Sequence, residues 1–289
     1  MTRPVSIVTG AASGIGRRMA VSLYRAGHRV LAADLDAAGL KRLSEEHGWE
    51  SDRNVVLRTL DVRSAAGWEE LVQLSVQRFG RLDVLLNVAG FLRPGYVHET
   101  DPATLDLHID VNVKGVMYGT RAAARQMIRQ AGGHIVNVAS IAAVSHTPGL
   151  AAYCASKHAV RGFTLSVAHE LARHGVAVSV FCPDAVETPM LTLQESYDEA
   201  AMTFASRRAL TLDEVEGALH RVLDERPLEV VLDVPLSGRA FGAKLGNLFP
   251  KLVSAALGRI VEQGRSAQKQ RLAHGHPEGH DGGKVRGAS

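Results

Sequence analysis

Cysteine is scarce in this sequence, because Cys154 and Cys182 are the only two among 289 residues. Two cysteines give no disulfide framework, so we expect a protein of the reducing cytoplasm. The sequence also lacks a run of about 18 apolar residues, which argues against a membrane-spanning helix, and its first residues lack a signal-peptide cleavage pattern. Aromatic residues make up only 5%, within a composition of 46% apolar and 22% charged residues. That composition is typical of a globular protein.

A strong excess of one charge is also missing from most of the chain. Residues 239–289 carry nine Lys/Arg and three Asp/Glu, a net of +6, whereas the remainder carries 24 and 27, a net of −3. The overall net charge of +3 therefore arises at the C-terminal end, and the main body is mildly acidic. This balance argues against nucleic-acid binding by the main body.

Short apolar, β-branched runs alternate with helical patterns from the first residues onward. Near-continuous apolar strands separated by helices predict a parallel sheet covered on both faces, in a single α/β domain over residues 1–237. The expected strands are 5–9, 29–34, 54–60, 82–87, 134–139, 177–182 and 229–234. The expected helices lie near 14–26, 36–47, 64–79, 101–130, 151–174 and 211–225.

Residues 238–272 follow a different pattern. Apolar side chains recur there at helical spacing, which predicts an amphipathic helical extension that Pro250 either starts or kinks. Residues 240–261 and their basic neighbours allow three interpretations: packing on their own domain or a partner subunit, contact with an anionic membrane surface, or a lid or tail without a defined role. Residues 273–289 are rich in His, Gly and Pro, which predicts a disordered tail, and we predict no metal site.

A glycine-rich turn joins the first expected strand to the first expected helix. Glycines allow a tight turn and a close approach of the backbone to a pyrophosphate, which then meets the helix N-terminus. An ordinary strand–helix turn is the alternative, but Asp34 at the end of the second strand supplies a carboxylate for ribose hydroxyls. The residues assigned to this part of a dinucleotide site are Gly10, Ser13, Gly14, Ile15, Gly16 and Asp34.

The Asp34 carboxylate also indicates which dinucleotide to expect. It would repel a 2′-phosphate, and the next residue, Leu35, offers no compensating cation, so we predict NAD rather than NADP. The third and fourth strands end at the same carboxyl edge, where open α/β sheets bind ligands. We therefore assign five more residues to the cofactor, the first two to its adenine: Asp61, Val62, Asn87, Ala89 and Gly90.

Tyr153 and Lys157 lie four residues apart in a predicted helix and therefore share one of its faces. A free phenol has a pKa near 10 and is a poor base at neutral pH. An ammonium group at about 4 Å would favour the phenolate by roughly 4 kcal/mol at an effective dielectric of 20. That corresponds to about three pKa units, enough to make the tyrosine a usable acid or base near pH 7.

These motifs, joined by Asn112, Ser140 and the stretch from Pro183 to Thr188, resemble the short-chain dehydrogenase/reductase family over about residues 4–235. The resemblance implies a Rossmann-type, doubly wound seven-stranded sheet. It also implies a nicotinamide cofactor, hydride exchange between an alcohol and a carbonyl, and a homodimer or homotetramer. Pro183, Val186 and Thr188 would then complete the cofactor site.

The resemblance implies a role for each of four residues. Tyr153 would be the acid/base, and Lys157 would lower its pKa and bind the nicotinamide ribose. Ser140 would orient the substrate oxygen, and Asn112 would hold a water that links Lys157 to solvent. Taken singly, a serine after a strand is usually a cap, an asparagine in a helix is usually structural, and a tyrosine is usually a packing residue.

Two positions depart from the family pattern. Val88 stands where that pattern often has a second asparagine, so an amide's hydrogen bonds are lost. Asp184 follows Pro183, where the family usually has glycine. If that position needs a positive φ, aspartate tolerates it better than most residues. We favour a structural role for Asp184 in the turn and keep substrate hydrogen bonding as the alternative.

The segments around the expected site supply mostly apolar side chains, which suit a lipophilic secondary alcohol or ketone. Residues 189–210 have an irregular pattern and are predicted to form a mobile lid. An acyl-thioester ketoreductase and a non-catalytic dinucleotide-binding scaffold are the alternative functions. The expected substrate contacts are Phe91, Ile141, Ala142, Leu150, Asp184 and Met190.

Overall fold

The computed structural model describes residues 3–234 and 250–274. Seven strands form one sheet in the order β3-β2-β1-β4-β5-β6-β7, and every neighbouring pair is parallel. This confirms the predicted single-domain, doubly wound Rossmann-type sheet. The strands are β1 Val5–Thr9, β2 Arg29–Asp34, β3 Val55–Thr59, β4 Val84–Asn87, β5 Gly133–Val138, β6 Val176–Pro183 and β7 Glu229–Leu232.

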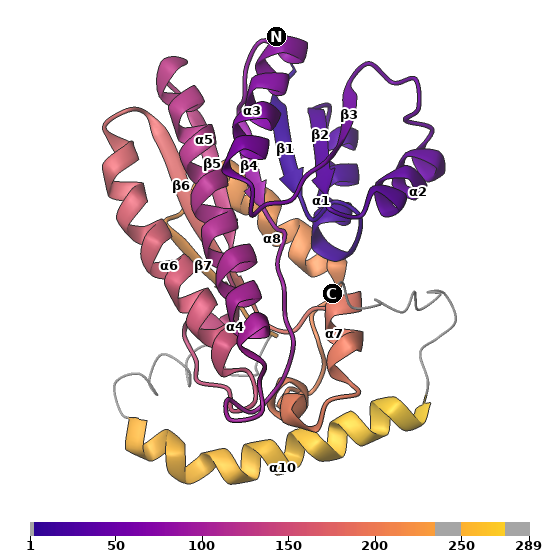
Figure 1. The fold of residues 1–289 in the computed structure, drawn as a ribbon, viewed down its shortest axis with the longest axis vertical. Helices are drawn as coiled ribbons and strands as arrows, with labels where there is room; N and C mark the ends of the chain where they lie inside the picture. Colours follow the sequence, from indigo (N-terminus) through magenta and orange to yellow (C-terminus); the bar gives the residue numbers. More distant parts are fainter. Residues whose placement is uncertain (1–2, 235–249, 275–289) are drawn as a thin grey trace.

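Helices cover both faces of the sheet (Figure 1). One face packs on α1 (Gly14–Arg25), α2 (Ala37–His47) and α8 (Leu212–Glu225), in a core that includes Met19, Leu43 and Leu219. The opposite face packs on α3 (Ala65–Phe79), α5 (Gly115–Arg129) and α6 (Ala151–Ala172), in a core that includes Trp68 and Met127. The central strands bury both faces, which is why their sequences read as continuous apolar runs.

The predicted helix over 101–130 contains a change of winding. Helix α4 (Pro102–Ile109) passes into a π-helical turn, Asp110–Lys114, before α5 begins at Gly115. The glycine at that junction is close-packed, because an added Cβ would lie 2.9 Å from the Val62 side chain. Single π-turns inside helices often occur at functional sites, and this one carries Asn112.

The described part of the C-terminal extension is helix α10 (Pro250–His274), which begins at Pro250. Figure 1 shows α10 crossing the molecule on the side toward which the strands point. Residues 238–249 and 275–289 of the predicted extension and tail lie outside the described residues. The helix includes residues 273 and 274, which were predicted to belong to the disordered tail. No helix in the described ranges is long and apolar enough to cross a membrane.

The predicted lid, residues 189–210, contains more regular structure than its irregular sequence pattern suggested. It contains helix α7 (Pro189–Gln194) and a 3₁₀ segment, η3 (Asp198–Ala205), and its apolar residues Leu191, Ala200 and Phe204 are buried. Helix α10 packs along η3, and Ala267 contacts the apolar cluster of the lid. Within the described residues, the extension therefore packs on its own domain.

Candidate active site

Tyr153 and Lys157 lie in the first two turns of α6, and both side chains are buried. The Lys157 ammonium lies over the face of the tyrosine ring, with Nζ 5.6 Å from the ring centroid. Nζ donates a hydrogen bond of 3.0 Å to the carbonyl oxygen of Val138, at the end of β5. The helix thus brings the pair together as predicted, but the cation faces the ring and the sheet edge.

The expected lowering of the Tyr153 pKa is not found in this geometry. Burial raises the pKa of Tyr153 above its ordinary value, and a hydrogen bond with the Ser140 side chain opposes that rise only in part. Burial also lowers the pKa of Lys157 to about 8. The prediction was wrong because it counted the attraction between ammonium and phenolate and left out the desolvation of both groups.

Asn112 links three parts of the site from the π-helical turn. Its Oδ1 accepts from the Phe91 amide at 2.7 Å, and its Nδ2 donates to the Phe91 carbonyl at 2.9 Å. The same Nδ2 donates to the Ser156 hydroxyl at 3.0 Å. A Cβ added to Gly90 would lie 3.4 Å from Asn112 Oδ1 and 3.7 Å from Lys157 Nζ, so both groups border the same backbone. The water that Asn112 would hold remains a prediction.

Ser140 follows β5 and caps the short 3₁₀ turn Ile141–Ala143, because its Oγ accepts from the Ala142 amide at 3.2 Å. Its hydrogen bond with Tyr153 gives the same side chain a second contact. Ser140 is therefore both a cap and a neighbour of the tyrosine. Ser140 follows β5, Asn112 lies in the π-helical turn before α5, and Tyr153 and Lys157 lie at the start of α6. These four residues come together at the carboxyl edge of the sheet.

The glycine-rich turn has the close backbone packing that dinucleotide binding requires. A Cβ at Gly16 would lie 2.2 Å from the Gly10 carbonyl oxygen, so this turn has no room for a larger residue. Asp34 is held beside it, because its Oδ2 accepts from the Ala12 amide and its Oδ1 from the Asp36 amide, each at 2.9 Å. Ser13 is exposed and makes no side-chain cap to α1, whereas Ile15 is half-buried. The turn and Asp34 therefore fit a dinucleotide.

The other predicted cofactor residues fall at two strand ends. Asp61 follows β3 and pairs with the Arg63 side chain at 2.7 Å, and its hydrogen bonds with Arg63 lower the Asp61 pKa. Val62 packs against Gly115. Asn87 is the last residue of β4, and its side chain donates to Asn137 Oδ1 at 2.8 Å inside the molecule. Asn87 could therefore meet a cofactor through its backbone, as could Ala89 and Gly90; these three assignments, with Asp61 and Val62, stay predictions.

Residues after β6 approach the glycine turn. A Cβ at Gly14 would lie 3.2 Å from the Thr188 methyl group, which brings Thr188 to the start of α1. Val186 is buried and forms a parallel bridge with Leu210. Pro183 is the last residue of β6. These contacts fit the predicted cofactor assignments of Pro183, Val186 and Thr188, which remain predictions.

The expected substrate residues divide into two groups. Ala142 and Leu150 form a buried cluster with Tyr153, and Met190 packs against this cluster. Phe91 reaches the tyrosine indirectly, because its ring packs on the edge of His108, 4.8 Å away, and His108 packs on Tyr153, 6.4 Å away. Ile141 is buried in the turn after β5. Ala142, Leu150, Met190 and Phe91 therefore gather near Tyr153.

The Asp184 carboxylate serves the turn. Its Oδ1 accepts from the Ala185 amide at 2.8 Å, and its Oδ2 accepts from the Ser206 hydroxyl at 3.2 Å. Asp184 does not have the positive φ that a glycine at this position would have suggested, since Ala131 and Arg226 are the non-glycine residues with positive φ in the described ranges. The structural alternative is therefore favoured over substrate binding.

Replacing Asp184 with alanine should lower the free energy of unfolding by about 1–3 kcal/mol, because two hydrogen bonds to a buried carboxylate are lost. Urea denaturation measures this change. Ser206→Ala is the matched control, since it removes one of the two partners and should cost less. A stability equal to that of the unmodified protein would contradict the structural role.

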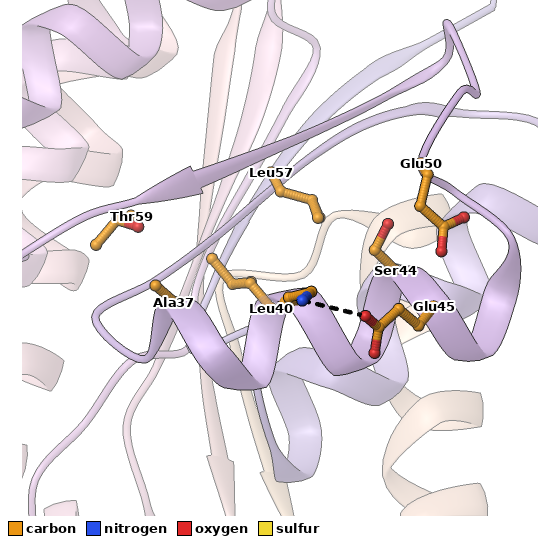
Figure 2. Close-up of a pocket in the computed structure, with 8 residues that line it drawn as sticks. Ala37, Leu40, Ser44, Glu45, Glu50, Leu57 and Thr59 are labelled. Atoms are coloured by element: carbon orange, nitrogen blue, oxygen red, sulfur yellow. Dashed lines mark ion pairs between the residues drawn. The ribbon is translucent and has the colours of Figure 1, made fainter.

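A separate groove of about 210 Å³ lies between α2 and the edge strand β3 (Figure 2). Lys41 and Glu45 form an ion pair of 3.6 Å on its α2 side. None of the residues predicted for the site lines this groove, so we assign it no part in the chemistry. Its lining consists of Ala37, Leu40, Lys41, Ser44, Glu45, Glu50, Leu57 and Thr59.

Comparison with known proteins shows the family of this chain. A family model described as short chain dehydrogenase matches residues 4–198. The chain belongs to the short-chain dehydrogenase family. It is therefore an oxidoreductase with a nucleotide-binding Rossmann fold, which confirms the predicted resemblance.

Two relatives of this short-chain dehydrogenase are named for the reactions they catalyse. This chain is 38% identical over 190 residues to 2-(R)-hydroxypropyl-CoM dehydrogenase of Xanthobacter autotrophicus, and the match covers 64% of this chain and 76% of the relative. It is 37% identical over 186 residues to the (S)-acetoin-forming diacetyl reductase of Staphylococcus epidermidis, covering 64% and 72%.

Solved structures with either dinucleotide bound share the fold. One from Burkholderia phymatum, in complex with NAD, superposes with a TM-score of 0.77 at 26% identity and covers 87% of this chain and 95% of its own. ElxO with NADP bound has a TM-score of 0.72 at 26% identity and covers 83% and 99%. Fold similarity therefore does not choose between NAD and NADP.

Three residues of this short-chain dehydrogenase site escaped the sequence-based prediction. Thr9 Oγ1 accepts from the amides of Val88 and Ala89 at 3.1 and 3.2 Å, which joins the ends of β1 and β4. Ser156 connects Asn112 to the Tyr153 carbonyl, to which it donates at 2.7 Å. His108 packs beside Tyr153. Only Ser156 had a usable signal, because it lies between Tyr153 and Lys157 in the sequence.

Proposed function

We propose that this short-chain dehydrogenase interconverts a lipophilic secondary alcohol and its ketone, with NAD as hydride carrier and Tyr153 as acid/base. The observation that carries the proposal is the grouping of Ser140, Tyr153, Lys157 and Asn112 at the sheet edge that also holds the glycine-rich turn. Oxidation of an alcohol removes a hydride from carbon and a proton from oxygen, so a base and a hydride carrier must flank the same carbon.

The chain's own residues supply the proton chemistry. Ser140 hydrogen-bonds the substrate oxygen and orients it toward Tyr153, which takes the proton on oxidation and returns it on reduction. Lys157 holds its ammonium over the Tyr153 ring and against the Val138 carbonyl, in place to bind the nicotinamide ribose. Asn112 and Ser156 extend the polar path from Lys157. When bound, NAD accepts or delivers the hydride at its nicotinamide.

The preference for NAD is proposed from Asp34. Its two oxygens accept backbone hydrogen bonds beside the glycine-rich turn, where a 2′-phosphate would meet a fixed negative charge. Replacing Asp34 with serine and Leu35 with arginine should shift the ratio of kcat/KM values toward NADP by about a hundredfold, equivalent to about 3 kcal/mol. Steady-state kinetics with both dinucleotides measures the shift.

Asp36→Ser is the control for this change of cofactor. It removes a carboxylate two residues away and keeps an N-cap side chain for α2, where Asp36 accepts from Gly39. The dinucleotide preference should stay as it is in that control. An unmodified protein that already prefers NADP would contradict the assignment of Asp34.

The lipophilic substrate is proposed from the apolar cluster of Leu92, Ala142, Leu150 and Cys154 around Tyr153. A screen of secondary alcohols, followed by NADH absorbance with NADP⁺ in parallel, tests the proposal. We expect cyclic lipophilic alcohols to be oxidised at least about tenfold more efficiently than polyols. Faster turnover of polyols would rule out an apolar substrate. The homodimer or homotetramer is also proposed, and sedimentation equilibrium measures it.

A further inference from the structure

Helix α10 presents two different faces over the part whose side chains are described. Gly264 and Gln268 are buried against the domain, and Arg271 is half-buried beside them. Arg265 and Lys269 lie off this face and are exposed. The spacing of four and three residues between 264, 268 and 271 is that of one helix face, so this face is a docking surface.

The helix lies very close to η3 at Gly264. A Cβ added there would lie 1.9 Å from the carbonyl oxygen of Ala201, which is much shorter than any real contact of a side-chain carbon. Only glycine allows the two backbones to approach this closely. Gly258, six residues earlier, has nothing within 4 Å of an added Cβ.

Gln268 binds the backbone between helix α7 and η3. Its buried Nε2 lies 3.1, 3.1 and 2.8 Å from the carbonyl oxygens of Gln194, Glu195 and Tyr197. Carbonyls at a helix C-terminus have no partner within the helix. The amide of Gln268 therefore fixes the point at which α7 ends and the chain turns toward η3.

Arg271 joins Glu195, within the lid, to Glu187, which lies between the end of β6 and the lid. Its guanidinium donates two hydrogen bonds to the Glu187 carboxylate, at 2.9 and 2.8 Å, and one to Glu195 at 2.9 Å. It also lies over the Phe204 ring, 5.9 Å from the centroid. Glu195 is 5% exposed, so this ion pair is largely shielded from solvent.

The other side of the lid faces the catalytic residues. Met190 packs against the cluster that contains Tyr153. A Cβ at Gly149, just before α6, would lie 2.0 Å from the carbonyl oxygen of Glu199 in η3. Residues 189–205 are therefore held between the start of the catalytic helix and α10.

We infer that helix α10 is a strap that fixes residues 189–205 beside the active site, with Gln268 and Arg271 as positioning residues for substrate binding. The inference rests on the proposed function for its kinetic consequence. Its structural part, the immobilisation of the lid by α10, stands independently of which substrate is used.

Gly264→Ala separates docking of the strap from formation of the helix. Alanine is the better helix former, so the variant favours α10 itself while its Cβ pushes the helix away from Ala201. We expect hydrogen exchange in peptides covering 189–205 to become about tenfold faster and the substrate KM to rise about tenfold. The kcat should change less than about threefold. Gly258→Ala, on the same helix, should change neither quantity.

Side-chain variants of the full chain provide the second test. Gln268→Ala and Arg271→Ala should raise hydrogen exchange in 189–205 and the substrate KM, with Arg271→Lys between Arg271→Ala and the unmodified protein because lysine keeps the charge without the two-pronged contact. Lys269→Ala and Arg265→Ala remove exposed cations of the same helix and should change neither.

The outcomes are distinguishable. Unchanged hydrogen exchange of 189–205 in both Gly264→Ala and Arg271→Ala would overturn the strap. Faster exchange with an unchanged substrate KM would overturn the positioning role. If the unmodified protein oxidises no alcohol and reduces no ketone, the proposed function fails, and the exchange measurements still decide whether α10 holds the lid.

Discussion

Replacing Tyr153 with phenylalanine should reduce kcat by about a thousandfold, the loss typical of removing a general acid or base. The variant keeps the ring that packs with Ala142, Leu150 and Cys154 and removes the hydroxyl that meets Ser140. NAD binding should therefore remain largely intact. Steady-state turnover of the best alcohol from the screen, together with NADH fluorescence titration, measures both quantities.

Tyr118→Phe is the matched control for this prediction. Tyr118 is only partly buried and packs against the core on the α5 side of the sheet, so loss of its hydroxyl should leave turnover unchanged. If Tyr153→Phe retains more than about a tenth of the activity, Tyr153 is not the acid/base. The remaining activity would then favour a dinucleotide-dependent reaction at a different group.

Replacing Lys157 with methionine should abolish turnover and yet stabilise the folded protein. Burial lowers the pKa of Lys157 from its ordinary 10.5 to about 8, so holding the ammonium in the fold costs about 3 kcal/mol at neutral pH. Methionine fills similar volume without that cost, but it leaves the Val138 carbonyl without its hydrogen bond. We expect a net gain of about 1–2 kcal/mol in the free energy of unfolding.

The pH dependence of this gain has a definite sign. Because the folded pKa is lowered, the unfolded chain binds the proton more readily between pH 10.5 and about 8, so the stability of the unmodified protein falls as the pH falls through that window. The advantage of Lys157→Met should therefore be full below pH 8 and should vanish near pH 10.5. Urea denaturation at several pH values measures it, and a difference that stays constant with pH would contradict desolvation of the ammonium as its cause.

The fold could be predicted from the sequence because its strands and helices follow local patterns of apolar residues and turn-forming residues. The first two strands were predicted residue for residue, since their apolar runs are bounded by Pro4, Gly10 and Asp34. The π-helical turn was not predicted, because it keeps the apolar periodicity of an ordinary helix and differs only in its winding. The docking of α10 was left open, because an amphipathic pattern does not say what covers its apolar face.

The residue types of the candidate site could be predicted from the sequence, whereas the pKa values of its buried groups could not. The spacing of Tyr153 and Lys157 gave their shared helix face, but the free energy of desolvating both groups depends on β5 and its neighbours. Asp184 shows the same limit, because its partner Ser206 is 22 residues away in the sequence. Side chains whose roles depend on partners from distant elements cannot be assigned from local patterns.

The position of α10 after all seven strands in the sequence has a consequence during synthesis. All seven strands leave the ribosome before Gly264, Gln268 and Arg271 do, and domains begin to fold as they emerge. A nascent chain can therefore complete its glycine-rich turn and bring Ser140, Tyr153 and Lys157 together before α10 holds residues 189–205. If α10 is the proposed strap, the cofactor site forms first during translation and the substrate site last.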